Sequence, residues 1–146
     1  MAITQAIANA FKKQLLEGDQ NFSNSVGDVF KLALYTSSAT LNSATTSFTT
    51  TNEVANTGTY ASGGDPLAGQ NTSIASGVAI VDFADLSFTG VTLTARGAMI
   101  YNTSSAVTNA AVAILDFGAD KTATSGTFTI QFPAFTTAAA ILRISG

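Results

Sequence analysis

The segment Thr127-Phe128-Thr129-Ile130-Gln131-Phe132 alternates polar side chains with large apolar ones. Successive side chains of a β-strand point to opposite faces, so the three apolar residues share the face that packs on a core. Pro133 follows directly, and proline cannot donate a hydrogen bond to a neighbouring strand. The segment therefore predicts a half-buried strand that ends at this proline.

The same period of two recurs in other parts of the chain. Phe30 to Tyr35 alternates large apolar residues with other side chains, which predicts a strand with one face on a core. Four more apolar runs are predicted strands: Gly77 to Phe83, Val91 to Tyr101, Ala110 to Phe117 and Ala138 to Ile144. Short turns are expected at residues 102–105 and 124–126. Strands at such short spacing predict a mainly β chain, an antiparallel β-sandwich or jelly-roll-like barrel formed by residues 1–146 as a single domain.

The N-terminal part carries apolar residues at every fourth position, which is the spacing of one helix face. These residues are Ile3, Ile7, Phe11 and Leu15. The pattern predicts an amphipathic helix over residues 4–17, with Gly18 as its C-terminal cap. We expect the apolar face to pack on the chain's own sheet, and contact with a neighbouring subunit is the alternative.

Two segments between the predicted strands are rich in small polar residues. Residues 36–51 are mostly Ser and Thr and suit a hairpin or an edge strand. Residues 52–70 carry the Gly, Asn, Asp and Pro content of a long loop. A loop of this length inside a compact domain usually contacts a partner or ligand, or is disordered. Its candidate contact residues are Glu53, Tyr60 and Pro66.

The composition excludes several classes of function. Charged residues make up 10% of the chain, against about 25% in typical soluble domains. The net charge is −3 and the six basic residues are scattered, which argues against binding to nucleic acid. No apolar run approaches the ~18 residues of a membrane span, and the N-terminus lacks the pattern of a secretory signal, so we expect synthesis in the cytoplasm. A surface this poor in charge suits burial against another protein.

The sequence offers little for catalysis. Asp116-Phe117-Gly118 matches the magnesium-binding triplet of protein kinases, but the chain has no histidine and none of the other kinase motifs. It also has no cysteine. Asp82, Asp85, Asp116 and Asp120 could gather around a calcium ion only if two strand ends met, and solvated turn carboxylates are the preferred interpretation. We therefore expect no catalytic, cofactor-binding or metal-binding residues, and an Arg96 that is solvated or pairs with Asp82 or Asp116.

A series of short motifs runs in order through nearly the whole chain. They are Phe30 to Leu41, Asn52-Glu53-Val54, Val81 to Asp85, Thr94 to Ala98, Ile100 to Asn102, Ala113 to Gly118, Gly126 to Pro133 and Ala140 to Ile144. In these motifs the chain resembles a family of small virion structural proteins of tailed bacteriophages.

The resemblance implies a non-enzymatic subunit of the phage particle, located in the virion after synthesis in the host cytoplasm. The expected role is a capsid decoration or cement protein, a homo-oligomer that binds the major capsid protein or other virion proteins, without nucleic acid, membrane or cofactor. A tail or fibre component that contacts the host receptor or other tail proteins is the alternative. The candidate partner-interface residues are Ile3, Ile7, Phe11, Leu15, Glu53, Tyr60 and Pro66.

Overall fold

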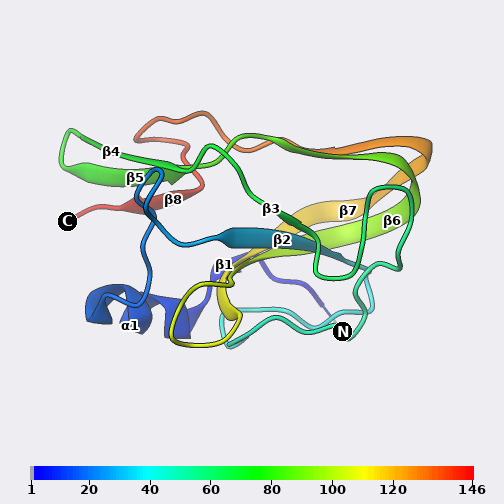
Figure 1. Ribbon diagram of the computed structural model, residues 1–146, viewed down its shortest axis with the longest axis horizontal. Coiled ribbons are helices and arrows are strands. Elements are labelled where there is room, and N and C mark those ends of the chain that lie inside the picture. Colours follow the sequence, from blue (N-terminus) through cyan, green and yellow to red (C-terminus); the bar gives the residue numbers. More distant parts are fainter. Residues whose placement is uncertain (1) are drawn as a thin grey trace.

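The computed structural model describes residues 2–146, which fold into two antiparallel β-sheets and one helix (Figure 1). The larger sheet has the strand order β1-β7-β6-β2-β3 and the smaller one β4-β5-β8. The elements are β1 (Ala6–Ile7), α1 (Asn9–Glu17), β2 (Phe30–Tyr35), β3 (Asp65–Pro66), β4 (Asn71–Ala75), β5 (Val78–Asp82), β6 (Leu86–Asn102), β7 (Ala110–Ile130) and β8 (Leu142–Ile144). The prediction of a mainly β, sandwich-like fold with one N-terminal helix is confirmed.

Strands β6 and β7 form one long hairpin that bends over at one end of the molecule. The pairing runs from Leu86↔Ile130 to Asn102↔Ala110, with an irregularity between Phe88 and Val91. Gly90 and Ser125 have left-handed backbone conformations at the bend, with φ of 62° and 46°. Such bulges sharpen the local twist and let a strand pair turn a corner. Figure 1 shows both strands curving over at the right and returning toward the smaller sheet.

This bend corrects one prediction. Residues 110–117 and 127–132 were expected to be separate strands joined by a turn at residues 124–126, but β7 is continuous from Ala110 to Ile130. Ser125-Gly126 supplies the backbone freedom that a turn needs, and a bulge inside a strand needs the same freedom. The predicted alternation itself is confirmed, because Phe128, Ile130 and Phe132 are buried while the polar residues between them are exposed.

Strand β2 has the predicted boundaries, but both of its faces are buried. Ala33 and Tyr35 are fully covered, as are the residues that alternate with them. The cover is the Ser/Thr-rich segment 36–51, where the Thr49 carbonyl accepts a hydrogen bond from the Tyr35 hydroxyl at 2.6 Å. Phe48 stacks on Tyr101 with ring centroids 4.7 Å apart. The segment is therefore neither a hairpin nor a regular edge strand, and its β-pairing is limited to isolated bridges.

The N-terminal helix is shorter than predicted. It begins at Asn9, whereas Ala6 and Ile7 pair with β7, and Ile3 forms a parallel bridge with Leu41. A spacing of four residues returns to the same face in a strand as well as in a helix, so the period did not separate the two states. Gly18 caps the helix in a left-handed conformation, as predicted.

The smaller sheet was predicted least well. β4 lies in a stretch for which no strand was predicted, and only Leu142–Ile144 of the predicted strand over residues 138–144 is extended. The amides of Ala139 and Ala140 instead bond to the Thr136 carbonyl in a turn. β5 confirms the predicted strand over residues 77–83, and β6 begins at Leu86 instead of Val91.

Candidate functional site

The loop over residues 52–70 is held by one carboxylate. Glu53 accepts hydrogen bonds from the Tyr60 hydroxyl at 2.8 Å, the Gly63 amide at 2.6 Å and the Ser62 hydroxyl at 2.8 Å. Tyr60 is 1% exposed and its ring packs edge-on against Phe88. Two of the candidate interface residues, Glu53 and Tyr60, therefore bond to each other and order the loop.

The same loop covers the bend of the long hairpin. The Thr59 amide donates to the Thr89 carbonyl at 3.0 Å, and the Thr89 and Thr92 amides donate to the hydroxyls of Thr59 and Thr57. A Cβ on Gly58 would lie 2.4 Å from the Gly90 carbonyl oxygen. These contacts satisfy backbone groups that the bulge removes from the ladder. The loop thus has a structural role within the chain. Among its candidate residues Pro66 is exposed in β3, Glu53 is half-buried and Tyr60 is buried.

The three tyrosines of the chain are buried hydrogen-bond donors. Burial is the main cause that raises the pKa of Tyr35 and Tyr60 far above the ordinary value, and it raises the pKa of Tyr101 to about 12. The Tyr101 hydroxyl donates to the Gly63 carbonyl at 2.6 Å. The Tyr60 and Tyr101 hydroxyls therefore hold the loop over residues 52–70, and the Tyr35 hydroxyl holds the segment over residues 36–51.

Two of the aspartates considered for a metal site, Asp116 and Asp85, accept hydrogen bonds from backbone amides, whereas Asp82 Oδ1 is buried without a hydrogen-bond partner. The Arg96 Nε lies 3.2 Å from Asp116 Oδ1, so Arg96 pairs with Asp116 and not with Asp82. The same oxygen accepts the Gly118 amide at 2.9 Å. That amide bond, followed by the Arg96 guanidinium, lowers the pKa of Asp116. The Asp-Phe-Gly triplet is therefore a strand-and-turn feature here. Within residues 2–146 no three His, Cys, Asp or Glu side chains gather in a way that could hold a metal ion.

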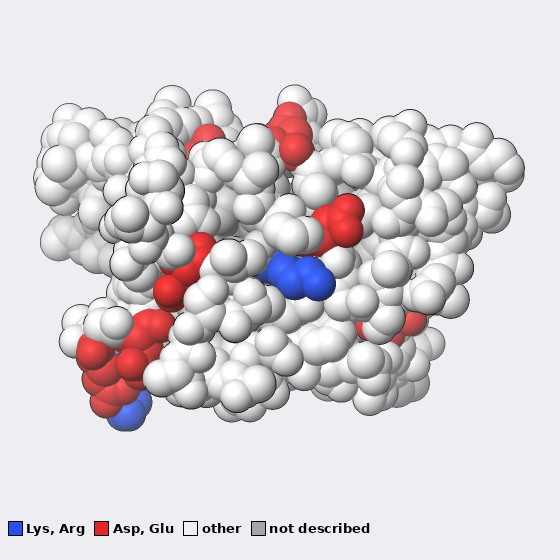
Figure 2. Space-filling view, in the orientation of Figure 1, with Lys and Arg blue, Asp and Glu red and all other residues white. Residues whose placement is uncertain are grey.

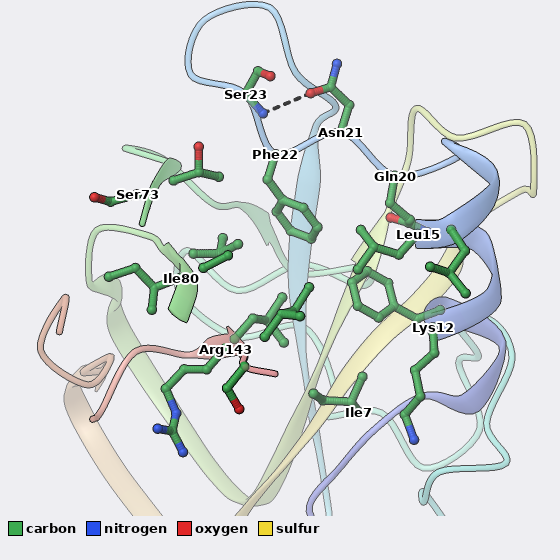
Figure 3. Close-up of a pocket in the computed structure, with 18 residues that line it drawn as sticks. Ile7, Lys12, Leu15, Gln20, Asn21, Phe22, Ser23, Ser73, Ile80 and Arg143 are labelled. Carbon is green, nitrogen blue, oxygen red and sulfur yellow. Dashed lines mark hydrogen bonds between the residues drawn. The ribbon is translucent and has the colours of Figure 1, made fainter. Parts of the chain in front are cut away.

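A large hollow lies between α1 and the smaller sheet. This groove has a volume of about 670 Å³ and is lined by α1, by residues 20–23 and by β4, β5 and β8 (Figure 3). Ile7, Phe11 and Leu15, three of the candidate interface residues, all line it. Phe11 packs edge-on against Phe22, with ring centroids 5.9 Å apart. The predicted apolar stripe therefore forms one wall of a groove.

One face of the smaller sheet supplies the opposite wall. Strand register places Thr72, Val81 and Leu142 in one row of this face and Ile74, Ala79 and Ile144 in the next. Leu142 of the first row belongs to the core. The second row is open to solvent, since Ile74 is 73% and Ile144 58% exposed. Across the groove, Leu16 of α1 is 90% exposed. The apolar interior of the sandwich is thus left uncovered at this end.

The two charged residues that line the groove are both basic. Lys12 and Arg143 are its charged lining residues, and no Asp or Glu of the described residues lines it. In Figure 3 these two side chains end on either side of Ile7 at the lower edge of the view. Figure 2 shows few, scattered charges on the visible face, with the largest group at the end where α1 lies.

The remaining candidates lie inside the chain. Ile3 is 7% and Phe11 3% exposed, which means that the helix face and the segment before it pack mainly on the chain's own sheet, as preferred from the sequence. Ile3, Phe11 and Tyr60 therefore offer little side-chain surface to a partner. Leu16, Ile144 and the groove between them were not predicted as a site, because α1 and β8 are more than a hundred residues apart in the sequence.

Comparisons with known proteins identify no relative, so inferences about function depend on the sequence, the fold and the groove. The chain matches no protein-family model, no curated protein and no solved structure. Over residues 2–146, no helix has both the length and the apolar character required to span a membrane.

Proposed function

We propose that this chain is a non-enzymatic structural protein of a bacteriophage virion, and that it acts as a capsid decoration or cement protein. One observation carries the proposal beyond the sequence resemblance. The bent half of the long hairpin, residues 86–95 and 122–130, contains no charged residue. Its exposed side chains are mainly hydroxyls, which form a surface called here the hydroxyl face: Ser87, Thr92, Thr94, Thr122, Thr127 and Thr129.

The hydroxyl face is suited to burial because four of its six hydroxyls already bond to one another. The Ser87 and Thr129 hydroxyls are 2.8 Å apart, and those of Thr94 and Thr122 are 2.9 Å apart. Burying an unpaired hydroxyl costs about 1–3 kcal/mol in proteins, whereas these cross-strand pairs keep their hydrogen bonds under a partner. A surface of this kind can cover a seam between capsid subunits at low desolvation cost.

Attachment to a capsid does not require a tight single contact. A standard interface removes on the order of 1,600 Å² from water, and many identical weak contacts on one particle add through avidity. The partners on this proposal are the major capsid protein or other virion proteins, and the location is the virion surface.

A tail or fibre station is the second candidate, because the same uncharged hydroxyls suit contact with a host receptor or with other tail proteins. The tyrosines that would strengthen such recognition are buried, which favours the head. A quantitative gel of purified particles distinguishes a head location from a tail location by copy number. A copy number near that of the major capsid protein supports decoration, and a dozen copies or fewer supports the tail. Failure to recover the chain with particles contradicts both.

A paired variant tests the surface itself. Thr94→Lys places a charge in the middle of the hydroxyl face, and Thr108→Lys places the same charge on the exposed loop after β6. We expect Thr94→Lys to reduce incorporation into particles at least tenfold and Thr108→Lys to leave it unchanged, with both variants folded by circular dichroism. Equal incorporation of the two variants would exclude the hydroxyl face as the contact.

A further inference from the structure

Exposed apolar side chains gather at the groove end of the molecule. Leu16 and Ile144 both line the groove and are 90% and 58% exposed, and Ile74 adjoins them in the outer row of the smaller sheet. Large apolar side chains that gather around a hollow mark an interaction site more often than single exposed ones do. The remaining question is which partner covers them.

Residues 12–19, which comprise the last two turns of α1 and the two residues after it, are symmetric in the way that a self-association requires. Lys12 lies three residues before Leu15, and Asp19 lies three residues after Leu16. An antiparallel pair of such segments, related by a two-fold axis between positions 15 and 16, places Lys12 of each copy beside Asp19 of the other. The same register places Leu15 against Leu16 of the other copy. The hydrophobic contact and both ion pairs therefore form together.

Both charges are available for this pairing. In the described residues the two salt bridges are Lys13–Glu17 and Arg96–Asp116, so neither Lys12 nor Asp19 takes part in a salt bridge. Lys12 makes only a 3.3 Å hydrogen bond to Asn9. Asp19 is held at the end of the helix because its amide donates to the Gln14 carbonyl at 2.9 Å. Its place beyond the αL cap at Gly18 is therefore fixed.

We propose that two copies of this chain form a symmetric dimer through the groove end, with α1 of one copy antiparallel to α1 of the other. Leu16 of each copy covers the apolar groove of its partner, and Lys12 meets Asp19 at both ends of the contact. This assignment rests on the groove and its charges, and it holds whether or not the chain is part of a virion.

The helices alone are too short for a stable interface. A nine-residue helix is about 14 Å long, and a standard interface covers about 800 Å² on each partner. That is about a ninth of the 7083 Å² surface of the chain. The outer row of the smaller sheet, Ile74, Ala79 and Ile144, supplies further apolar area beside the helix. An apolar segment of another protein could also fill the groove, but it would leave the matched positions of Lys12 and Asp19 without a role.

Sedimentation equilibrium over a range of concentrations tests the dimer. We expect the full chain to dimerise reversibly and Leu16→Glu to raise the dissociation constant at least thirtyfold. Val26→Glu is the matched control, because Val26 is 79% exposed but does not line the groove. Circular dichroism confirms that each variant is folded. A chain that stays monomeric, or a dimer that both glutamate variants weaken equally, would overturn the proposal.

Charge reversal tests the register. Because the symmetry repeats each contact, Lys12→Asp or Asp19→Lys alone is expected to raise the dissociation constant about tenfold. The double variant Lys12→Asp/Asp19→Lys restores both pairs and should return it to within about threefold of the original. A double variant as weak as the single ones would reject the antiparallel arrangement of α1.

Discussion

The two ends of the sandwich are closed in different ways. At one end the backbone itself crosses between the layers, because β6 and β7 bend at Gly90 and Ser125 and the loop over residues 52–70 caps the bend. At the other end side chains such as Phe11 and Phe22 pack between the layers, and a groove remains. The first end is therefore suited to stability, and the second leaves apolar surface available for a partner.

Removing an aromatic ring from each end should have unequal effects. Phe88 is fully buried beside Tyr60, so Phe88→Ala is expected to lower the free energy of unfolding by about 3–5 kcal/mol. Phe11 is also buried but lines the groove, where neighbours can relax, so Phe11→Ala should cost less, about 2–3 kcal/mol. Urea unfolding of both variants gives the comparison. Equal losses would mean that the two ends are packed alike.

A pair of glycines tests the cap on the bend. Gly58 and Gly77 both have left-handed φ values, of 52° and 76°. A Cβ at Gly77 meets no other described atom within 4 Å, whereas one at Gly58 meets the Gly90 backbone. We expect Gly77→Ala to cost about 1 kcal/mol from conformation alone and Gly58→Ala about 2–3 kcal/mol in urea unfolding. If the two losses agree, the loop does not hold the bend.

The smallest effect on the free energy of unfolding is expected for a substitution at the groove end. Leu16 makes few contacts within the chain, so Leu16→Ala should change the free energy of unfolding by less than about 0.5 kcal/mol in dilute solution. The unfolding temperature of the original chain should rise with protein concentration, because a dimer stabilises the folded state by mass action. In Leu16→Ala this rise should be much smaller. A large loss of stability at high dilution would place Leu16 in the core instead.

The features that could be predicted from sequence are those with a clear local pattern. Strand β2 and the buried alternation through Phe132 follow from the period of two, and the end of α1 follows from Gly18. The start of α1 could not be predicted, because a spacing of four fits a strand and a helix equally well. Ser125-Gly126 was similarly ambiguous, since a turn and a strand bulge both use a left-handed residue.

The groove could not be predicted because it depends on tertiary contacts. Its walls come from α1, from β4 and β5 and from the C-terminal β8, which are far apart in the sequence and meet only in the folded chain. Glu53 and Tyr60 were misjudged for the same reason, because their role also depends on tertiary contacts. Their residue types suggested a contact surface, but each is the other's hydrogen-bond partner in the folded chain.

The continuous path of β6 and β7 has a further consequence for how the molecule fluctuates. Because the two layers share these strands, we expect their separation to begin at the groove end, where apolar side chains surround an open hollow. The two layers should therefore open around a hinge at Gly90 and Ser125, with the largest separation beside α1. Amide hydrogens of α1 and β8 are expected to exchange with solvent deuterium well before those at the centre of the hairpin.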